Sequence, residues 1–176
     1  MDLLGLLNNK AAKSTEKRAE IAEALRARHI TIKEIQPLKA ALDDKKMALV
    51  LEAMEAVSNK NPEIADLEWL HFARDFILSK SNSAKREASR VVGNIARLFP
   101  DDLRVAVQYL LENTGDGGTV VRWGSAYALA RIIQIPAYAN SELYDTLTGL
   151  CEQEQENGVK NQLLNGLKKA KKVRTL

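Results

Sequence analysis

Three side chains with metal-binding chemistry recur about one helical turn apart, at Glu68, His71 and Asp75. On one face of a helix, this spacing can present an imidazole and two carboxylates to a metal ion. No cysteine or second histidine lies near the set, and His29 is far away in the sequence. We therefore interpret these residues as surface hydrogen-bonding or ion-pairing groups and predict no metal site.

Two other features have the chemistry of a reactive site. Cys151 is the only cysteine, which excludes an internal disulfide, and its place in an amphipathic segment indicates a buried thiol. Residues 115–118 (Gly-Asp-Gly-Gly) precede an expected helix and can offer backbone N–H groups to an anion. They lack the Lys-Ser/Thr pair of a phosphate-binding loop, so we interpret them as a tight turn. The sequence predicts no catalytic residue and no cofactor.

A row of arginine and aromatic side chains gives the clearest sign of a binding function. Plotted as helices, residues 86–97 and the positions 37 residues later place these side chains opposite the apolar stripe. The seven residues, here called the ridge, are Arg86, Arg90, Asn94, Arg97, Trp123, Tyr127 and Arg131. Arginine and tryptophan often anchor interfaces, and guanidinium groups bind carboxylates and phosphates bidentately.

A simpler interpretation of the ridge is that it is only the solvated face of two helices, with Trp123 covering a neighbouring helix. We predict a binding surface because a large aromatic side chain opposite the apolar stripe has no evident role in the core.

An apolar motif with helical spacing recurs four times and indicates which elements position the ridge. Its copies are separated by 38, 37 and 38 residues and lie at 50–57, 88–95, 125–132 and 163–170. A repeat of about 40 residues that is helical within each copy is typical of stacked helix pairs, which cannot bury their apolar faces alone. Such arrays usually present surfaces to partners.

Capping residues, prolines and glycines divide the chain into about ten helical segments and no strand, so we predict an all-α fold. Pro37 should kink or restart the segment that opens at Thr31. The expected segments are 3–7, 15–28, one opening at 31, 44–59, 62–79, 83–98, 102–114, 119–135, 141–155 and 158–172.

The segment Thr119-Val120-Val121-Arg122, followed by Ala126, Ala128, Leu129 and Ile132, resembles the second helix of a HEAT repeat. The resemblance covers about residues 31–172. It implies a right-handed superhelix of stacked antiparallel helix pairs, whose second helices line a concave side that carries the ridge. Residues 1–30 would be capping helices and 173–176 a basic tail. Asp116 is similar to the family's turn aspartate, but Ser79 and Glu154 stand at its counterparts, so we expect no continuous Asp–Arg ladder.

Composition and charge narrow the class of protein. The chain is 45% hydrophobic and 28% charged, as folded proteins are, and its net charge of +3 is too small to indicate nucleic-acid binding by itself. Its last seventeen residues contain six basic and no acidic side chains. A signal peptide and an apolar run of about 18 residues are both lacking, so we expect a cytoplasmic protein without a membrane span.

The predicted function is a non-catalytic HEAT-like scaffold that binds a protein partner, one with acidic side chains, through the concave ridge. The alternative is a nucleic-acid-binding HEAT-like protein. A variant of that alternative is DNA alkylpurine glycosylase activity, because enzymes of that kind resemble HEAT-like arrays and read bases with concave tryptophans, arginines and an acidic residue. Glu52 is the only acid on the stripe for that role.

Overall fold

The computed structural model describes residues 1–175, which form eleven α-helices and four short 3-10 helices, with no strand in that range. The prediction of an all-α fold is confirmed. The helices are α1 (Leu3–Asn8), α2 (Ser14–Arg26), α3 (Ile32–Ile35), α4 (Asp44–Lys60), α5 (Leu67–Arg74), α6 (Asn82–Ile95), α7 (Arg104–Asn113), α8 (Thr119–Ile132), α9 (Pro136–Ala139), α10 (Leu143–Gln153) and α11 (Asn157–Ala170). None of the described helices combines the length and apolar character needed to cross a bilayer; the longest, α4, has 17 residues.

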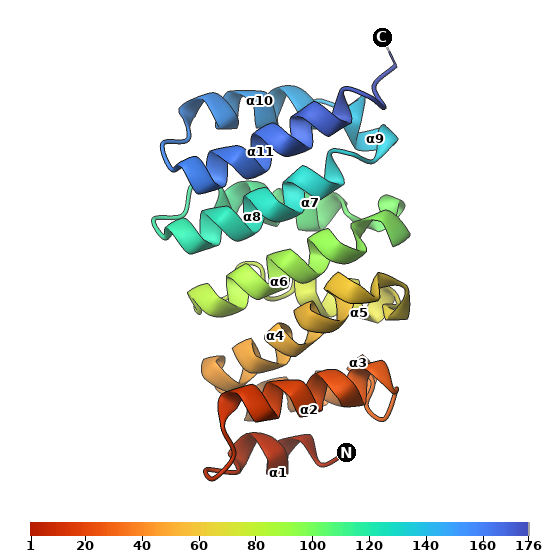
Figure 1. The fold of residues 1–176 in the computed structure, drawn as a ribbon, viewed down its shortest axis with the longest axis vertical. Coiled ribbons are helices and arrows are strands. Elements are labelled where there is room, and N and C mark those ends of the chain that lie inside the picture. The colour runs from red at the N-terminus through yellow and green to blue at the C-terminus, as the bar shows by residue number, and fades with distance from the viewer. Residues whose placement is uncertain (176) are drawn as a thin grey trace.

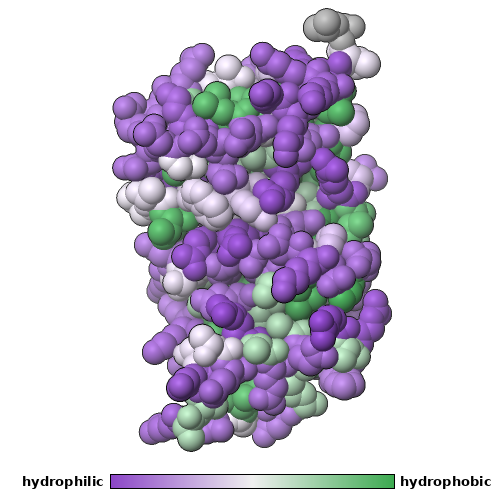
Figure 2. Space-filling model, in the orientation of Figure 1, coloured by the Kyte–Doolittle hydropathy of each residue, from purple (hydrophilic) through white to green (hydrophobic). Residues whose placement is uncertain are grey.

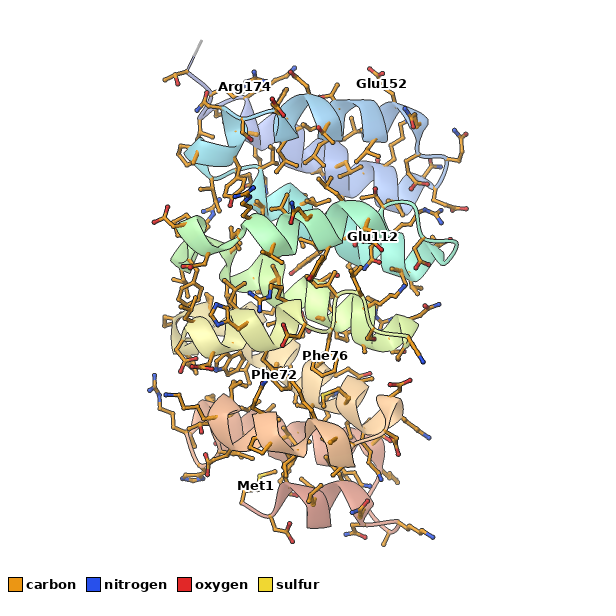
Figure 3. The ribbon with its side chains drawn as sticks, turned by 180° about the vertical axis from the view of Figure 1, so that it is seen from behind. Met1, Phe72, Phe76, Glu112, Glu152 and Arg174 are labelled. Carbon is orange, nitrogen blue, oxygen red and sulfur yellow. The ribbon has the colours of Figure 1, made fainter. Side chains whose placement is uncertain are left out.

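The longer helices are arranged in two layers. Helices α2, α4, α6, α8 and α11 lie side by side in chain order, each in contact with the next, and form what we call the front layer (Figure 1). Helices α5, α7 and α10 lie behind it, as the opposite view shows, and the two ends of the chain are at opposite ends of the molecule (Figure 3). The four copies of the apolar motif fall on α4, α6, α8 and α11.

The core lies between the two layers and along the seams of the front layer. The motif positions supply it, and Leu51, Val91 and Leu129 are fully buried. From the back layer, Leu70, Leu110 and Leu147 meet them in the same cluster. Each helix pair therefore buries its apolar faces partly against its neighbours, which makes the front layer a continuous support for the ridge.

Two glycines set the distance between α6, α8 and α11. A Cβ atom on Gly93 would lie 2.8 Å from Cα of Ala128, and one on Gly166 would lie 2.6 Å from Cα of Ala130. Real Cβ atoms do not approach so closely, so the three backbones pack at a separation that only glycine permits. The side chains that lie about one helical turn after Gly93 and Gly166 are thereby brought close to those of the neighbouring front-layer helix.

One expected helix is interrupted in the structure, and one short helix lies in the gap between the expected helices 119–135 and 141–155. The segment predicted as one helix over 62–79 is a 3-10 turn (Pro62–Ile64) followed by α5, because the Asp66 side chain accepts a hydrogen bond from Trp69 N at 3.3 Å and starts a new helix. Pro136 opens the short α9 before α10 begins. At Pro37 the restart expected from the sequence is confirmed, since α3 gives way to a 3-10 helix over Gln36–Ala41.

Candidate functional site

The seven ridge residues lie next to one another in the front layer. Arg86, Arg90 and Asn94 are on α6, Arg97 is on the 3-10 turn Ala96–Leu98 that follows it, and the other three are on α8. The Tyr127 hydroxyl donates to Asn94 Oδ1 at 2.7 Å, and the guanidinium of Arg90 is 5.9 Å from the Trp123 ring and 5.7 Å from the Tyr127 ring. The Arg131 guanidinium carbon lies over the Tyr127 ring, 3.5 Å from its centroid.

Because the ridge lies opposite the apolar stripe, its sequence pattern predicts an exposed patch; this is wrong for Tyr127, and five of the other six residues are only half-buried. Tyr127 is only 7% exposed, and of the seven residues Arg97 alone is in the exposed class. The reason is the close approach of α6 and α8 at Gly93, which leaves the Tyr127 ring between the two helices. Trp123 is half-buried and packs against the core, with its ring 5.5 Å from that of Tyr127.

Two buried glutamates that sequence reasoning missed neutralise the central arginines. Arg90 Nη1 donates to Glu87 at 2.9 Å, and its Nη2 lies 2.7 Å from Glu55 Oε1 without an aligned hydrogen bond. Arg86 Nε donates to Glu87 at 2.6 Å. The Glu87 side chain is 2% exposed and that of Glu55 is 10% exposed. The only available signal was the three-residue spacing of Glu87 and Arg90, which suits a pair on one helix.

Burial gives Glu55 an unusual chemistry for a carboxylate. Burial raises its pKa, the nearby Glu87 raises it further, and the Arg90 charge lowers it only in part. We call the Glu55–Glu87–Arg90 cluster the ridge network. Its two carboxylates hold Arg90 near the Trp123 and Tyr127 rings, and neither carboxylate lines the two surface depressions described next.

The two depressions lie at opposite ends of the ridge network. The first, of about 520 Å³, we call the Trp123 cavity, and it is lined by Arg86, Arg90, Thr119, Val120 and Trp123. Val120 is 46% exposed, and the surface over the first half of α8 is pale where most of the face is purple (Figure 2). The second, of about 290 Å³, we call the Arg131 cavity, and its lining includes Asn94, Arg97, Arg131, Gln134 and Lys169.

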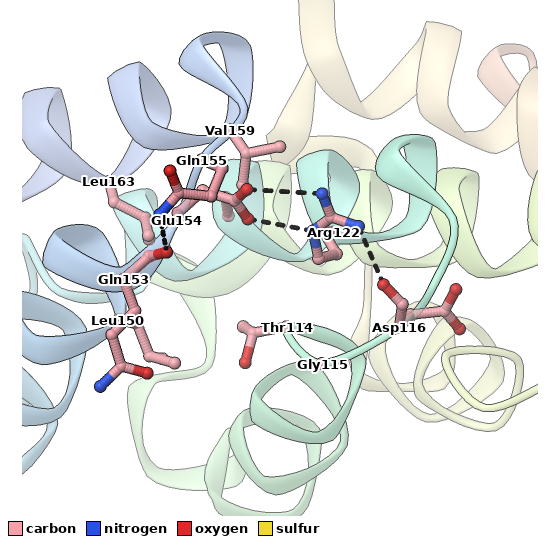
Figure 4. A pocket seen from close by; sticks show the side chains of 11 residues that line it. Thr114, Gly115, Asp116, Arg122, Leu150, Gln153, Glu154, Gln155, Val159 and Leu163 are labelled. Atoms are coloured by element: carbon pink, nitrogen blue, oxygen red, sulfur yellow. Dashed lines mark hydrogen bonds and ion pairs between the residues drawn. The ribbon is translucent and has the colours of Figure 1, made fainter.

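A third cavity, of about 370 Å³, lies where α7 and α10 meet α8 and α11, and its charges are paired (Figure 4). Arg122 Nε donates to Glu154 at 3.0 Å, and its Nη1 donates to the Asp116 carbonyl at 3.0 Å. The Asp116 carboxylate accepts from Lys85 at 2.7 Å. The Asp–Arg ladder is thus not continuous. Two ion pairs, here called rungs, do form, Lys85–Asp116 and Arg122–Glu154, and each joins a front-layer helix to the loop before the next one. Met47 and Ser79 leave the equivalent first rung without charges.

These rungs make the folded protein sensitive to acid. The Lys85 hydrogen bond lowers the pKa of Asp116. Burial raises the pKa of Glu154, but the hydrogen bond and charge of Arg122, together with backbone N–H donors at Glu156 and Gln155, lower it overall. The stability that both carboxylates contribute is therefore complete above their ordinary pKa values and is lost as the pH falls through the lowered ones. We expect Asp116→Asn to flatten the fall of the unfolding free energy between about pH 5 and pH 3 in urea titrations. Glu112→Gln, an exposed control on α7, should keep the slope, and an unchanged slope in Asp116→Asn would rule out the rung as its source.

The remaining sequence candidates have ordinary partners. Asp75 pairs with Lys39 and Arg74, at 3.0 and 3.1 Å, and within residues 1–175 no group of three His, Cys, Asp or Glu side chains is placed to hold a metal. Cys151 is buried as expected, and burial raises its pKa. In the 115–118 turn, Gly118 N donates to the Asp116 carboxylate at 2.7 Å, so this carboxylate takes the place that an external anion would have at the turn.

Glu52, the one acid expected on the stripe, lies apart from the tryptophan. It is 3.7 Å from Arg18 of α2, and it lines a separate cavity of about 680 Å³ with residues of α2 and of the loops before α4 and α6. That cavity shares no lining residue with the Trp123 cavity.

No protein-family model matches the chain, and neither a curated protein nor a solved structure is detectably similar to it. The ridge is therefore the feature of the molecule that bears on its function.

Proposed function

We propose that this protein is a non-catalytic HEAT-like interaction module that binds a protein partner through the ridge. In this proposal residues 31–172 form a right-handed superhelix capped by residues 1–30, and the front layer is its concave side. The observation that carries the proposal is the Trp123 cavity, where a half-buried tryptophan lies beside the exposed Val120 and two arginines. Aromatic anchors next to an open apolar depression are typical of interface centres.

The ridge network supports this role because it fixes the anchor before the partner arrives. Arg90 is held by Glu55 and Glu87 while its guanidinium lies over Trp123, so little side-chain freedom remains to be lost on binding. The Trp123 ring also lies close to α11, since a Cβ atom on Gly158 would be 3.9 Å from it.

Charge pairing favours a protein over nucleic acid as the partner. Affinity for nucleic acid comes mainly from basic side chains that neutralise phosphates. Glu87 and Glu55 already neutralise Arg86 and Arg90, so the middle of the front layer is not a continuous basic track. The basic side chains at the other end of the ridge and at the end of α11, among them Lys168 and Lys169, keep nucleic acid as the second candidate.

Glycosylase activity is not part of the proposal. The glycosylases that resemble HEAT-like arrays read bases with concave tryptophans and an acidic residue, so such a site would need an acid beside Trp123. Glu52 is paired with Arg18 beside another cavity, and Glu55 is held under Arg90. We also propose a cytoplasmic location, for which the single, buried cysteine gives the support.

Trp123→Ala should weaken binding of the partner by about 2 kcal/mol or more, which is roughly 30-fold in the dissociation constant, while the protein stays folded. The measurement is isothermal titration calorimetry with the partner purified after affinity capture. Leu67→Ala is the matched control, because Leu67 is an exposed apolar residue, 38% exposed, in the back layer.

The salt dependence of the same titration separates the two candidate partners. A protein partner should give a shallow decrease of affinity with salt and a dominant loss in Trp123→Ala. A steep decrease, in proportion to the phosphates neutralised, would favour nucleic acid. Equal affinities of Trp123→Ala and wild type would remove the Trp123 cavity from the interface.

A further inference from the structure

We propose that the Arg131 cavity binds an oxyanion, a carboxylate or phosphate group carried by a side chain of the protein partner. This inference rests on the proposed function, because it names the group that the second half of the ridge recognises. Three successive front-layer elements each supply one basic side chain to this cavity: Arg97 after α6, Arg131 on α8 and Lys169 on α11. No aspartate or glutamate is among its lining residues.

The three basic side chains of the Arg131 cavity lack the carboxylate partners that the rest of the ridge has. Within residues 1–175, no Asp or Glu oxygen lies within 4.0 Å of the charged nitrogens of Arg97, Arg131 or Lys169. Arg86 and Arg90, at the other end, are both paired. Glu55, beyond 4.0 Å, is the carboxylate whose pKa the Arg131 charge lowers, and it is already paired with Arg90. Net positive charge therefore remains at this end of the ridge, and an anionic group is its electrostatic complement.

The donors of the cavity are positioned by the fold. Arg131 lies over the Tyr127 ring and makes one long hydrogen bond, 3.5 Å from Nη1 to the Tyr127 carbonyl, so most of its five N–H donors have no protein acceptor. Arg97 Nη2 donates to Gln134 Oε1 at 3.1 Å. Glycine packing at Gly93 and Gly166, less than two turns before Arg97 and Lys169, keeps the three elements close together. Preorganised guanidinium groups of this kind suit planar carboxylates and phosphates.

The negative ends of the helix dipoles offset only part of the positive charge at the Arg131 cavity. Because α6, α8 and α11 all end near the cavity, basic side chains there are also favoured by the helix dipoles. Each helix end contributes only about half a negative charge, however, against one full positive charge per element. The Ala130 carbonyl is moreover satisfied by Gln134 Nε2 at 2.6 Å and not by an arginine. An excess of positive charge therefore remains for a ligand.

The spacing of the two cavities limits what the partner can be. Trp123 and Arg131 are eight residues apart on one helix, which corresponds to about 12 Å. An extended peptide covers this distance in about four residues, at roughly 3.3 Å each. The fitting segment therefore carries an apolar side chain for the Trp123 cavity and an acidic or phosphorylated side chain about four residues away.

Inorganic phosphate and acetate, titrated separately into the full-length protein and followed by NMR, test this site without the partner. We expect saturable shifts of the amide signals around Arg97, Arg131 and Lys169. Lys169→Gln should weaken the binding about tenfold, as the loss of one charge-assisted hydrogen bond does. Lys168→Gln is the matched control, since it removes the same charge from the neighbouring exposed residue of α11, which does not line the cavity.

The two anions distinguish the two sources of the group. Tighter binding of phosphate would indicate a phosphorylated side chain, and tighter binding of acetate a glutamate or aspartate. Shifts spread evenly over the surface lysines, or equal losses in Lys169→Gln and Lys168→Gln, would overturn the proposal. Localised shifts together with full partner binding by Trp123→Ala would leave the anion site standing and reject the Trp123 interface. Evenly spread shifts together with weakened partner binding by Trp123→Ala would reject the anion site alone.

Discussion

Leu129→Asp should unfold the protein or lower its free energy of unfolding by more than about 4 kcal/mol. Leu129 lies on α8 at the centre of the front layer and is fully buried. The substitution removes its apolar contacts and places a carboxylate among apolar side chains with no basic partner built for it. Because a domain of this size has about 5–15 kcal/mol of stability in total, the loss should appear directly in circular dichroism and urea denaturation.

Leu164→Asp provides the matched control for this substitution. Leu164 is also a motif leucine, on the neighbouring α11, but it is 49% exposed. Its replacement should change the unfolding free energy by less than about 1 kcal/mol. Equal effects of the two substitutions, or a stable Leu129→Asp protein, would show that the front layer is not held together by the repeated motif.

Arg90→Met should lower the free energy of unfolding by about 3 kcal/mol, the second largest effect that we expect. The substitution keeps an unbranched apolar side chain but leaves Glu55 buried without its positive partner, and Glu87 paired with Arg86 alone. An unpaired buried charge costs far more than the pair contributes, so the effect arises mainly from the Glu55 carboxylate left behind. Chemical denaturation at neutral pH measures it.

Compensation within the ridge network separates this cause from lost packing. In the Arg90→Met background, Glu55→Gln should restore part of the stability because it removes the unpaired charge. Arg97→Met is the matched control, since Arg97 is exposed and bonds only to Gln134, and it should cost less than about 1 kcal/mol. If Glu55→Gln restored nothing, the loss in Arg90→Met would be one of packing.

The repeat period was sufficient to predict that α4, α6, α8 and α11 lie side by side and that the ridge residues would be neighbours; α2, which carries no copy of the motif, was expected only as a capping helix. Equivalent positions 37 residues apart, such as Arg90 and Tyr127, face each other because consecutive copies of the motif pack side by side. The start of α5 after Asp66 was missed because the apolar periodicity continues through this residue. The hydrogen bond from Trp69 N to the Asp66 side chain is a local interaction that competes with a continuous helix.

The burial of the ridge could not be predicted from the sequence. How deeply Tyr127 lies between α6 and α8 depends on their separation, which Gly93 sets through a contact with Ala128 of another repeat. Glu55 was missed for a similar reason, because its partner Arg90 lies on the next front-layer helix. The Glu154 rung was missed because a glutamate stands where the family has aspartate, and its side chain still reaches Arg122.

Hydrogen exchange of the protein in complex with its purified partner, captured from a nuclease-treated extract, tests the central claim most directly. We expect protection to concentrate on α6 and α8, over residues 86–97 and 123–134, and to disappear when Trp123→Ala replaces the wild type. Protection confined to α5, α7 and α10 of the back layer would contradict the account.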